Sequence, residues 1–161
     1  MNIRPASPDD ASAIADIYNY YITNTIITFE EIEVDATEIG SRIQAIQTQF
    51  PYLVYELDNR ILGYAYATAF RPRSAYRFSV ESTVYLDQTK GGKGFGTELY
   101  SALINELRSR QFHCAIGGIA LPNAASVALH EKLGFNKIAH LTEVGRKFDR
   151  WVDVGYWQLP L

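Results

Sequence analysis

Residues 76–100, YRFSVESTVYLDQTKGGKGFGTELY, determine how the rest of the chain can be arranged. Aromatic and β-branched residues predict a long strand from Tyr76 to Leu86. The glycine-rich run at 91–96 interrupts that pattern, and Leu99, Leu103 and Leu107 then form an apolar stripe at helical spacing. The stretch therefore predicts a strand and a helix joined by a loop of glycines.

Local signals predict further elements on both sides of this stretch. Ser7 and Pro8 are typical of a helix start, and Asp35 marks a second one. The turn at 58–60 has hairpin length and separates two β-rich segments. Together these elements predict an α+β or α/β fold in a single domain spanning residues 1–161. The remaining predictions are strands at 2–5, 52–57, 61–70, 114–121, 135–141 and 151–159, and a helix from Asn123 to Leu133 that ends before Gly134.

Composition excludes several classes of protein. The chain of 161 residues has 15 basic and 18 acidic side chains, a net charge of −3, so it lacks the basic surface of a nucleic-acid binder. One cysteine forms no internal disulfide. The beginning of the chain lacks a signal-peptide core, and no apolar run is long enough to span a membrane. We therefore expect a soluble, cytoplasmic protein with no nucleic-acid or membrane partner.

The glycine loop GGKGFG is the sharpest chemical signal. Glycines let backbone N–H groups turn toward a ligand, and the following helix start adds partial positive charge, so the loop is suited to a pyrophosphate, with Lys93 nearby. The loop does not match the Walker pattern, and Thr97 breaks the dinucleotide-binding fingerprint. The alternative is a mobile connection without a ligand.

Charged residues on and before the long strand are the second signal. Strand alternation places Arg77 and Glu81 on one face, where a carboxylate is a candidate general base or the partner of a salt bridge to Arg77 or another arginine. Arg71 and Arg73 extend the basic cluster, which suits an acidic small molecule or is simply solvated. HEKLG at 130–134 lacks the second His of a zinc-protease helix, so no metal site is expected.

Four motifs together resemble the phosphinothricin N-acetyltransferase family, a branch of the GNAT superfamily of acetyl-CoA-dependent N-acetyltransferases. They are ESTVYL (81–86), GGKGFGTELY (91–100), LPNAASVALHEKLGF (121–135) and VGRKFDRWVDVGYWQ (144–158). The resemblance covers nearly the whole chain. It implies a mixed, mostly antiparallel sheet that is splayed near its centre, with helices on both faces.

The resemblance also implies where acetyl-CoA binds. In this family the pantetheine arm pairs with the strand and the pyrophosphate lies on the loop amides. Family loops usually begin with Gln or Arg where this chain has Gly91, although Gly94 and Gly96 match, so we expect binding to survive because backbone amides do most of the holding. The implied cofactor residues are Val84, Tyr85, Leu86, Gly91, Gly92, Lys93, Gly94, Phe95, Gly96, Thr97, Asn123 and Ser126.

Roles in catalysis and acceptor binding follow from the same resemblance. Glu81 matches the proposed general base, and His130 and Tyr100 match residues to which catalytic roles are assigned. The implied acceptor is the α-amine of a small amino acid analogue such as phosphinothricin, methionine sulfoximine or methionine sulfone, in an enzyme that is commonly a homodimer. The alternatives are acetylation of a protein N-terminus, a lysine or a polyamine, and a CoA sensor without activity. The implied acceptor residues are Phe29, Arg71, Arg73, Tyr76 and Glu81.

Overall fold

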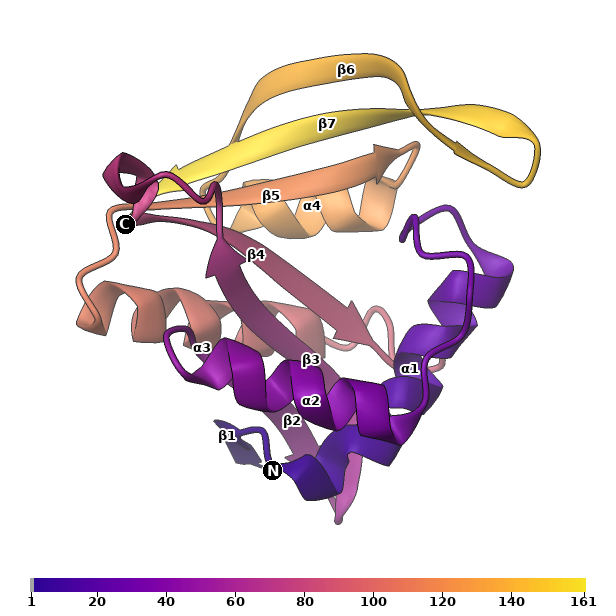
Figure 1. Ribbon diagram of the computed structural model, residues 1–161, viewed down its shortest axis with the longest axis vertical. Coiled ribbons are helices and arrows are strands. Elements are labelled where there is room, and N and C mark those ends of the chain that lie inside the picture. Colours follow the sequence, from indigo (N-terminus) through magenta and orange to yellow (C-terminus); the bar gives the residue numbers. More distant parts are fainter. Residues whose placement is uncertain (1) are drawn as a thin grey trace.

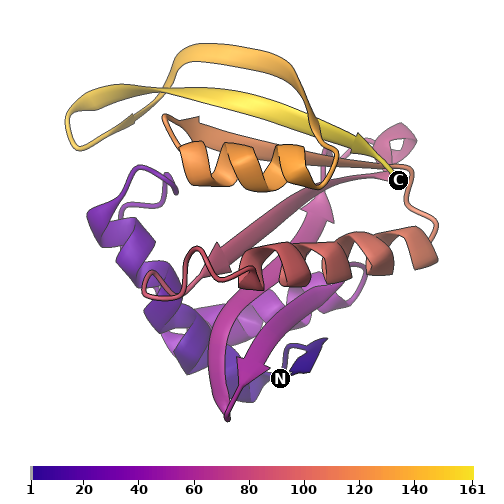
Figure 2. The ribbon, with the colours of Figure 1, turned by 180° about the vertical axis from the view of Figure 1, so that it is seen from behind.

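The computed structural model describes residues 2–161, which form a seven-stranded sheet covered by helices on both faces (Figures 1 and 2). The strand order is β1-β2-β3-β4-β5-β7-β6, and this mixed α and β architecture confirms the predicted fold class. No helix in the described part is long and apolar enough to cross a membrane. The elements are β1 (Asn2–Pro5), α1 (Ala11–Asn24), α2 (Ala36–Gln47), β2 (Tyr52–Leu57), β3 (Arg60–Ala69), β4 (Ser79–Leu86), α3 (Phe95–Ser109), β5 (Cys114–Leu121), α4 (Ala124–Lys132), β6 (Asn136–Lys147) and β7 (Arg150–Pro160), with 3-10 turns at Pro8–Asp10 and Ser74–Tyr76.

The sheet opens in its middle, between β4 and β5. These two strands run parallel and pair over only three residues, of which Glu81 opposite Ile116 is the last. All other neighbouring strands are antiparallel. Beyond Glu81, the rest of β4 stays paired with β3 and the rest of β5 stays paired with β7, so the two halves of the sheet part (Figure 2).

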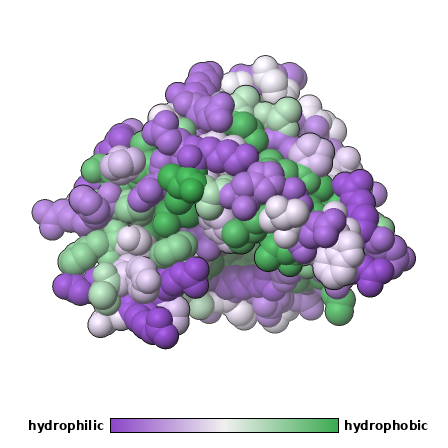
Figure 3. Space-filling model, turned by 90° about the horizontal axis from the view of Figure 1, so that it is seen from above, coloured by the Kyte–Doolittle hydropathy of each residue, from purple (hydrophilic) through white to green (hydrophobic). Residues whose placement is uncertain are grey.

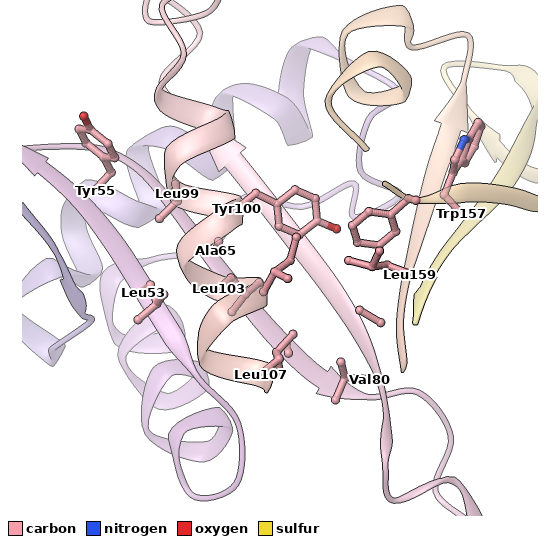
Figure 4. Packing of buried hydrophobic residues seen from close by; sticks show 14 of the residues in the cluster. Leu53, Tyr55, Ala65, Val80, Leu99, Tyr100, Leu103, Leu107, Trp157 and Leu159 are labelled. Carbon is pink, nitrogen blue, oxygen red and sulfur yellow. The ribbon is translucent and has the colours of Figure 1, made fainter. Parts of the chain in front are cut away.

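Side-chain alternation sends the helices to opposite faces. Leu53 and Tyr55 of β2 belong to the cluster that packs against α3, whereas Tyr52 and Val54 belong to the cluster under α1 and α2. The predicted apolar stripe of α3, Leu99, Leu103 and Leu107, is fully buried against the sheet (Figure 4). Burial of this kind contributes roughly 1.5–3 kcal/mol for each such side chain.

Some predicted boundaries were wrong. The strand predicted from Tyr76 begins at Ser79, because a 3-10 turn at Ser74–Tyr76 follows Pro72. The last two strands are longer than predicted, at Asn136–Lys147 and Arg150–Pro160. A register shift between Leu141 and Gly145 disturbs the alternation from which a strand is recognised.

Asp10 links the start of the chain to the first helix. Its carboxylate accepts two 2.8 Å hydrogen bonds from the Arg4 guanidinium and a third from the Ser7 N–H, and these contacts hold the pKa of Asp10 below its usual range. We expect Asp10→Ala to lower the free energy of unfolding by about 2 kcal/mol, because it leaves Arg4 without one of its two carboxylate partners.

Urea denaturation measures this loss. Because the folded pKa of Asp10 is lowered, its stabilisation is present above the unfolded pKa of about 3.9 and is lost as the pH falls through the folded value. The wild-type and Asp10→Ala proteins should therefore converge in stability in acid. A difference that stays constant down to pH 2 would contradict this account.

Candidate active site

The open edge of β4 offers backbone groups to a ligand. The Asp87 N–H donates to the Leu62 carbonyl and the Phe70 N–H to the Ser79 carbonyl, so the odd-numbered residues of β4 point their polar backbone groups at β3. The N–H and C=O groups of Val84 and Leu86 consequently face the gap. The backbone groups of Tyr85 instead point at β3, where Tyr85 pairs with Tyr64.

One of these groups already has a partner. The Tyr21 hydroxyl of α1 donates a 2.6 Å hydrogen bond to the Leu86 carbonyl. Among residues 2–161, the structure gives no such side-chain partner to the Val84 backbone. Val84 is therefore the position of β4 best able to pair with a ligand entering the gap.

The glycine loop continues from β4 into the first turn of α3. Gly92 and Gly94 have φ angles of +76° and +87°, a left-handed backbone that favours glycine, and Gly94 is the N-cap of α3. The N–H groups of Phe95, Gly96 and Thr97 lie in the first turn, where no helix carbonyl is available to them. The predicted anion-binding geometry is thus present. A Cβ added at Gly91 would meet nothing within 4 Å.

A groove of about 470 Å³ runs from the gap to this loop and to α4. The Asn123 side chain caps α4 by accepting a 3.1 Å hydrogen bond from the Ser126 N–H, which leaves its amide N–H groups without a protein partner in the described chain. The predicted residues that line the groove are Val84, Tyr85, Leu86, Gly91, Gly92, Gly94, Gly96, Thr97, Asn123 and Ser126.

Two predicted residues point elsewhere. The Phe95 ring packs 5.2 Å from the Tyr55 ring, and Phe95 and Lys93 line a separate hollow. Conversely, Tyr21 and Lys132 line the groove but were missed. Lys132 could have been predicted, because the helical spacing of the segment that follows Asn123 places it on the face of α4 that lines the groove. Tyr21 lies on α1, far from the groove in sequence, and no local pattern indicates that it reaches the groove.

Glu81 is half-buried at the point where the sheet opens. Its Oε1 lies 3.8 Å from where a Cβ on Gly118 would be, on the face of the sheet that carries Tyr156. The predicted alternative, a salt bridge to Arg77 or another arginine, is not formed within residues 2–161. Arg77 precedes the strand, and its guanidinium donates to the Ser74 carbonyl. Burial raises the pKa of the Glu81 carboxyl, and the charge of Arg71 partly opposes this shift. These are the properties of a carboxylate that can accept a proton near neutral pH.

Tyr100 and His130 form a buried pair that does not line the groove. The His130 Nδ1 lies 2.7 Å from the Ser126 carbonyl oxygen, which only accepts, so Nδ1 carries the proton. The Nε2 atom, 3.1 Å from the Tyr100 hydroxyl, therefore accepts the Tyr100 proton, while Ser82 of β4 lies 2.8 Å from the same hydroxyl. Burial lowers the pKa of His130 and raises the pKa of Tyr100, so both side chains are uncharged at neutral pH.

The predicted acceptor residues lie on two loops. Arg71, Arg73 and Tyr76 come from the exposed loop between β3 and β4, and neither arginine forms an ion pair within residues 2–161. Phe29 comes from the loop between α1 and α2, and its ring rests on Gly145 of β6. The structure therefore keeps both guanidinium groups available for an anionic ligand.

Comparison with known proteins matches residues 3–155 to the family model described as an acetyltransferase (GNAT) domain. The chain is 36% identical over 158 residues to phosphinothricin N-acetyltransferase of Streptomyces viridochromogenes, covering 98% of this chain and 86% of that protein. It is 38% identical over 162 residues to the L-methionine sulfoximine/L-methionine sulfone acetyltransferase of Salmonella typhimurium, covering 100% of this chain and 95% of that protein.

Two solved structures have nearly the same fold. The ribosomal-protein-alanine N-acetyltransferase of Brucella melitensis superposes with a TM-score of 0.97 at 38% identity, covering 100% of both chains. The GNAT superfamily phosphinothricin acetyltransferase of Sinorhizobium meliloti, in complex with acetyl-CoA, superposes with a TM-score of 0.95 at 36% identity, covering 99% of this chain and 88% of that one.

Proposed function

Because this chain belongs to the GNAT family of acetyl-CoA-dependent N-acetyltransferases, we propose that it acetylates the α-amine of a small amino acid analogue. The expected acceptors are of the phosphinothricin, methionine sulfoximine and methionine sulfone class, on which the relatives named above act. Transfer would be direct, in a ternary complex: the amine nitrogen would form its bond to the acetyl carbon as the bond from that carbon to the CoA sulfur breaks, and CoA would leave as its thiolate. The observation that carries this proposal is the half-buried Glu81 carboxylate at the opening of the sheet, on the strand whose next residues, from Val84 on, line the groove.

The groove fits the acetylated cofactor. Its glycine backbone and the free N–H groups of the first turn of α3 suit a pyrophosphate, with Lys132 adding positive charge from α4. The Val84 backbone, open toward the gap, suits an amide-bearing arm that binds as an added strand. Acetyl-CoA supplies a thioester that is reactive toward amines. The Val84 N–H, which faces the gap, would donate a hydrogen bond to the thioester oxygen, on which negative charge would develop as the amine adds.

Glu81 performs the proton transfer in this proposal. An amino acid amine is protonated near neutral pH and attacks only after losing a proton, which the Glu81 carboxylate accepts directly or through a water. Holding both substrates in the opening lowers the entropic part of the barrier. Tyr100 and His130 form a hydrogen-bonded chain to Ser82, the residue that follows Glu81 on β4. In this proposal they hold the base in place and do not contact the substrates.

Arg73, with Arg71 and Tyr76, is proposed to bind the acidic group of the acceptor, while Phe29 covers the amine side. We expect Arg73→Ala to raise the KM for acidic analogues about tenfold, because a charged hydrogen-bonded contact contributes about 1.5–3 kcal/mol. The KM for acetyl-CoA should stay within twofold. Steady-state kinetics with each substrate varied in turn measures both values, and equal effects on the two would remove Arg73 from the acceptor site.

A CoA-thiol release assay across amino acid analogues, polyamines and short peptides tests the proposed function. Turnover of the analogues is expected. Turnover of alanine-ended peptides alone would favour the second candidate, acetylation of a protein N-terminus, which the similarity to the Brucella melitensis structure supports. Binding of acetyl-CoA without any turnover would point to a sensor.

A homodimer, a cytoplasmic location and a single domain over 1–161 remain predictions. The surface seen in Figure 3, on the β6–β7 side, shows hydrophobic patches among hydrophilic ones. Several large apolar side chains of the β6–β7 hairpin are exposed, which is consistent with a partner subunit on this side. They are Ile138, Leu141, Val144, Phe148 and Trp151.

A further inference from the structure

The loop between α1 and α2 lies on the same face of the sheet as Glu81. Glu81 is paired with Ile116 of β5, and Ala120 follows four residues later on the same face of that strand. Ile26 of the loop belongs to the same buried cluster as Ala120 and Val152 of β7. Phe29, three residues after Ile26, thus belongs to the loop that covers the face of the sheet on which Glu81 lies. In the proposed function this is the face where the acceptor binds.

Lys147, the last residue of β6, is hydrogen-bonded to the backbone of this loop. Only 3% of Lys147 is exposed, and its Nζ donates a 2.8 Å hydrogen bond to the Thr28 carbonyl oxygen. Within residues 2–161 no carboxylate lies within ion-pair distance of this ammonium group, although the charge of Glu31 acts on it. The backbone of the loop is therefore the direct hydrogen-bond partner of a buried cation.

Gly145, two residues before Lys147, holds the aromatic ring of the loop. A Cβ added to Gly145 would lie 2.3 Å from Cε2 and 2.4 Å from Cζ of Phe29. The Phe29 ring consequently lies directly on the backbone of β6, and any side chain at position 145 would overlap the ring. Gly145 and Lys147 are two residues apart, so both face the loop.

The other side of the loop is attached to the first two helices. The Tyr18 hydroxyl of α1 lies 2.8 Å from Thr28 Oγ1 and also bonds Glu30. Arg42 of α2 donates to both Glu30 oxygens, at 2.9 and 2.7 Å. The loop therefore bridges the two halves of the sheet, with α1 and α2 on one side and β6 on the other.

We propose that Lys147 and Gly145 are positioning residues for the acceptor: they fix loop 25–31 on β6 so that Phe29 closes the acceptor side over Glu81. This inference rests on the proposed function, in which Phe29 contacts the acceptor. It assigns a role in acceptor specificity to β6, which is the edge strand of the sheet and is separated from β4 by β5 and β7. The anchoring selects acceptors whose side chain fits beneath a fixed Phe29 ring.

The test compares Lys147→Met and Gly145→Ala with Arg146→Met as the matched control. Arg146 lies between the two positions on the opposite face of β6, and its side chain is exposed. We expect both anchoring variants to raise the KM for the amino acid acceptor about tenfold while the KM for acetyl-CoA stays within twofold. Hydrogen exchange at the amides of residues 26–30 should accelerate at least tenfold in Lys147→Met and stay unchanged in the control.

A double substitution isolates the contact with the ring. In a Phe29→Ala background, Gly145→Ala should raise the acceptor KM no further, because the ring it displaces is gone. A normal acceptor KM in Lys147→Met, or unchanged exchange in the loop, would overturn the inference. So would a rise in the acceptor KM from Gly145→Ala that persists without Phe29. Failure of the wild-type chain to turn over any amino acid analogue would instead overturn the proposed function, and that is measured before any variant.

Discussion

Glu81→Gln is expected to lower kcat/KM for the amino acid acceptor by about 10²- to 10⁴-fold, the usual contribution of a general base. Glutamine keeps the size and hydrogen-bonding capacity of the side chain but accepts no proton near neutral pH. The groove for acetyl-CoA is unaltered, so its affinity, measured by calorimetry, should be that of the wild type.

The pH profile identifies the same group by an independent route. Burial raises the pKa of Glu81, so the acid limb of the wild-type kcat/KM profile should lie above the ordinary pKa of about 4.3 for a glutamate. Activity falls as the pH drops through that value, because the protonated carboxyl accepts no further proton. The residual activity of Glu81→Gln should lack this limb.

Stability measurements distinguish the loss of the base from a loss of activity caused by unfolding of the Glu81→Gln variant. A raised folded pKa means that the ionised Glu81 opposes folding above that pKa, so Glu81→Gln should be at least as stable as the wild type at pH 7. Glu106→Gln is the matched control, because Glu106 lies on the exposed side of α3 in a pair with Arg110. Full activity of Glu81→Gln across the pH range would show that another group is the base.

Gly94→Val is expected to weaken acetyl-CoA binding at least tenfold. Gly94 has a φ of +87° at the N-cap of α3, a conformation that costs an L-residue about 1–2 kcal/mol and a β-branched residue more. The loop relaxes in the free protein, and binding must restore the conformation that presents the amides. Each 1.4 kcal/mol corresponds to a factor of ten in Kd.

Calorimetric titration with acetyl-CoA and with CoA measures this effect. Gly40→Ala is the control glycine: it lies inside α2, where an added Cβ would be 3.9 Å from its nearest neighbour, so binding should not change. An unchanged Kd for Gly94→Val would mean that the loop amides do not hold the cofactor. A wild-type chain that gives no heat with either ligand would overturn the cofactor assignment itself.

Much of the site was predictable because its signals are local. The alternation around Glu81, the glycines of 91–96 and the cap at Asn123 each depend on a few consecutive residues. Arg77 shows the limit of such reasoning: its spacing from Glu81 suggested a shared strand face, but the turn at Ser74–Tyr76 delays the strand to Ser79. An error of three residues in the predicted start of the strand thus suggested, as one of two alternatives for Glu81, an ion pair that is not formed.

The sequence by itself determined the succession of strands and helices along the chain, the glycine loop and the carboxylate on β4, since hydrophobic periodicity and backbone preferences act over one or two turns of chain. Only the tertiary structure decided that β4 and β5 part after Glu81 and that Tyr100 and His130 are buried together. It also decided that Lys147 meets Thr28, 119 residues earlier in the chain. Such contacts depend on how whole elements pack, and no local pattern encodes that packing.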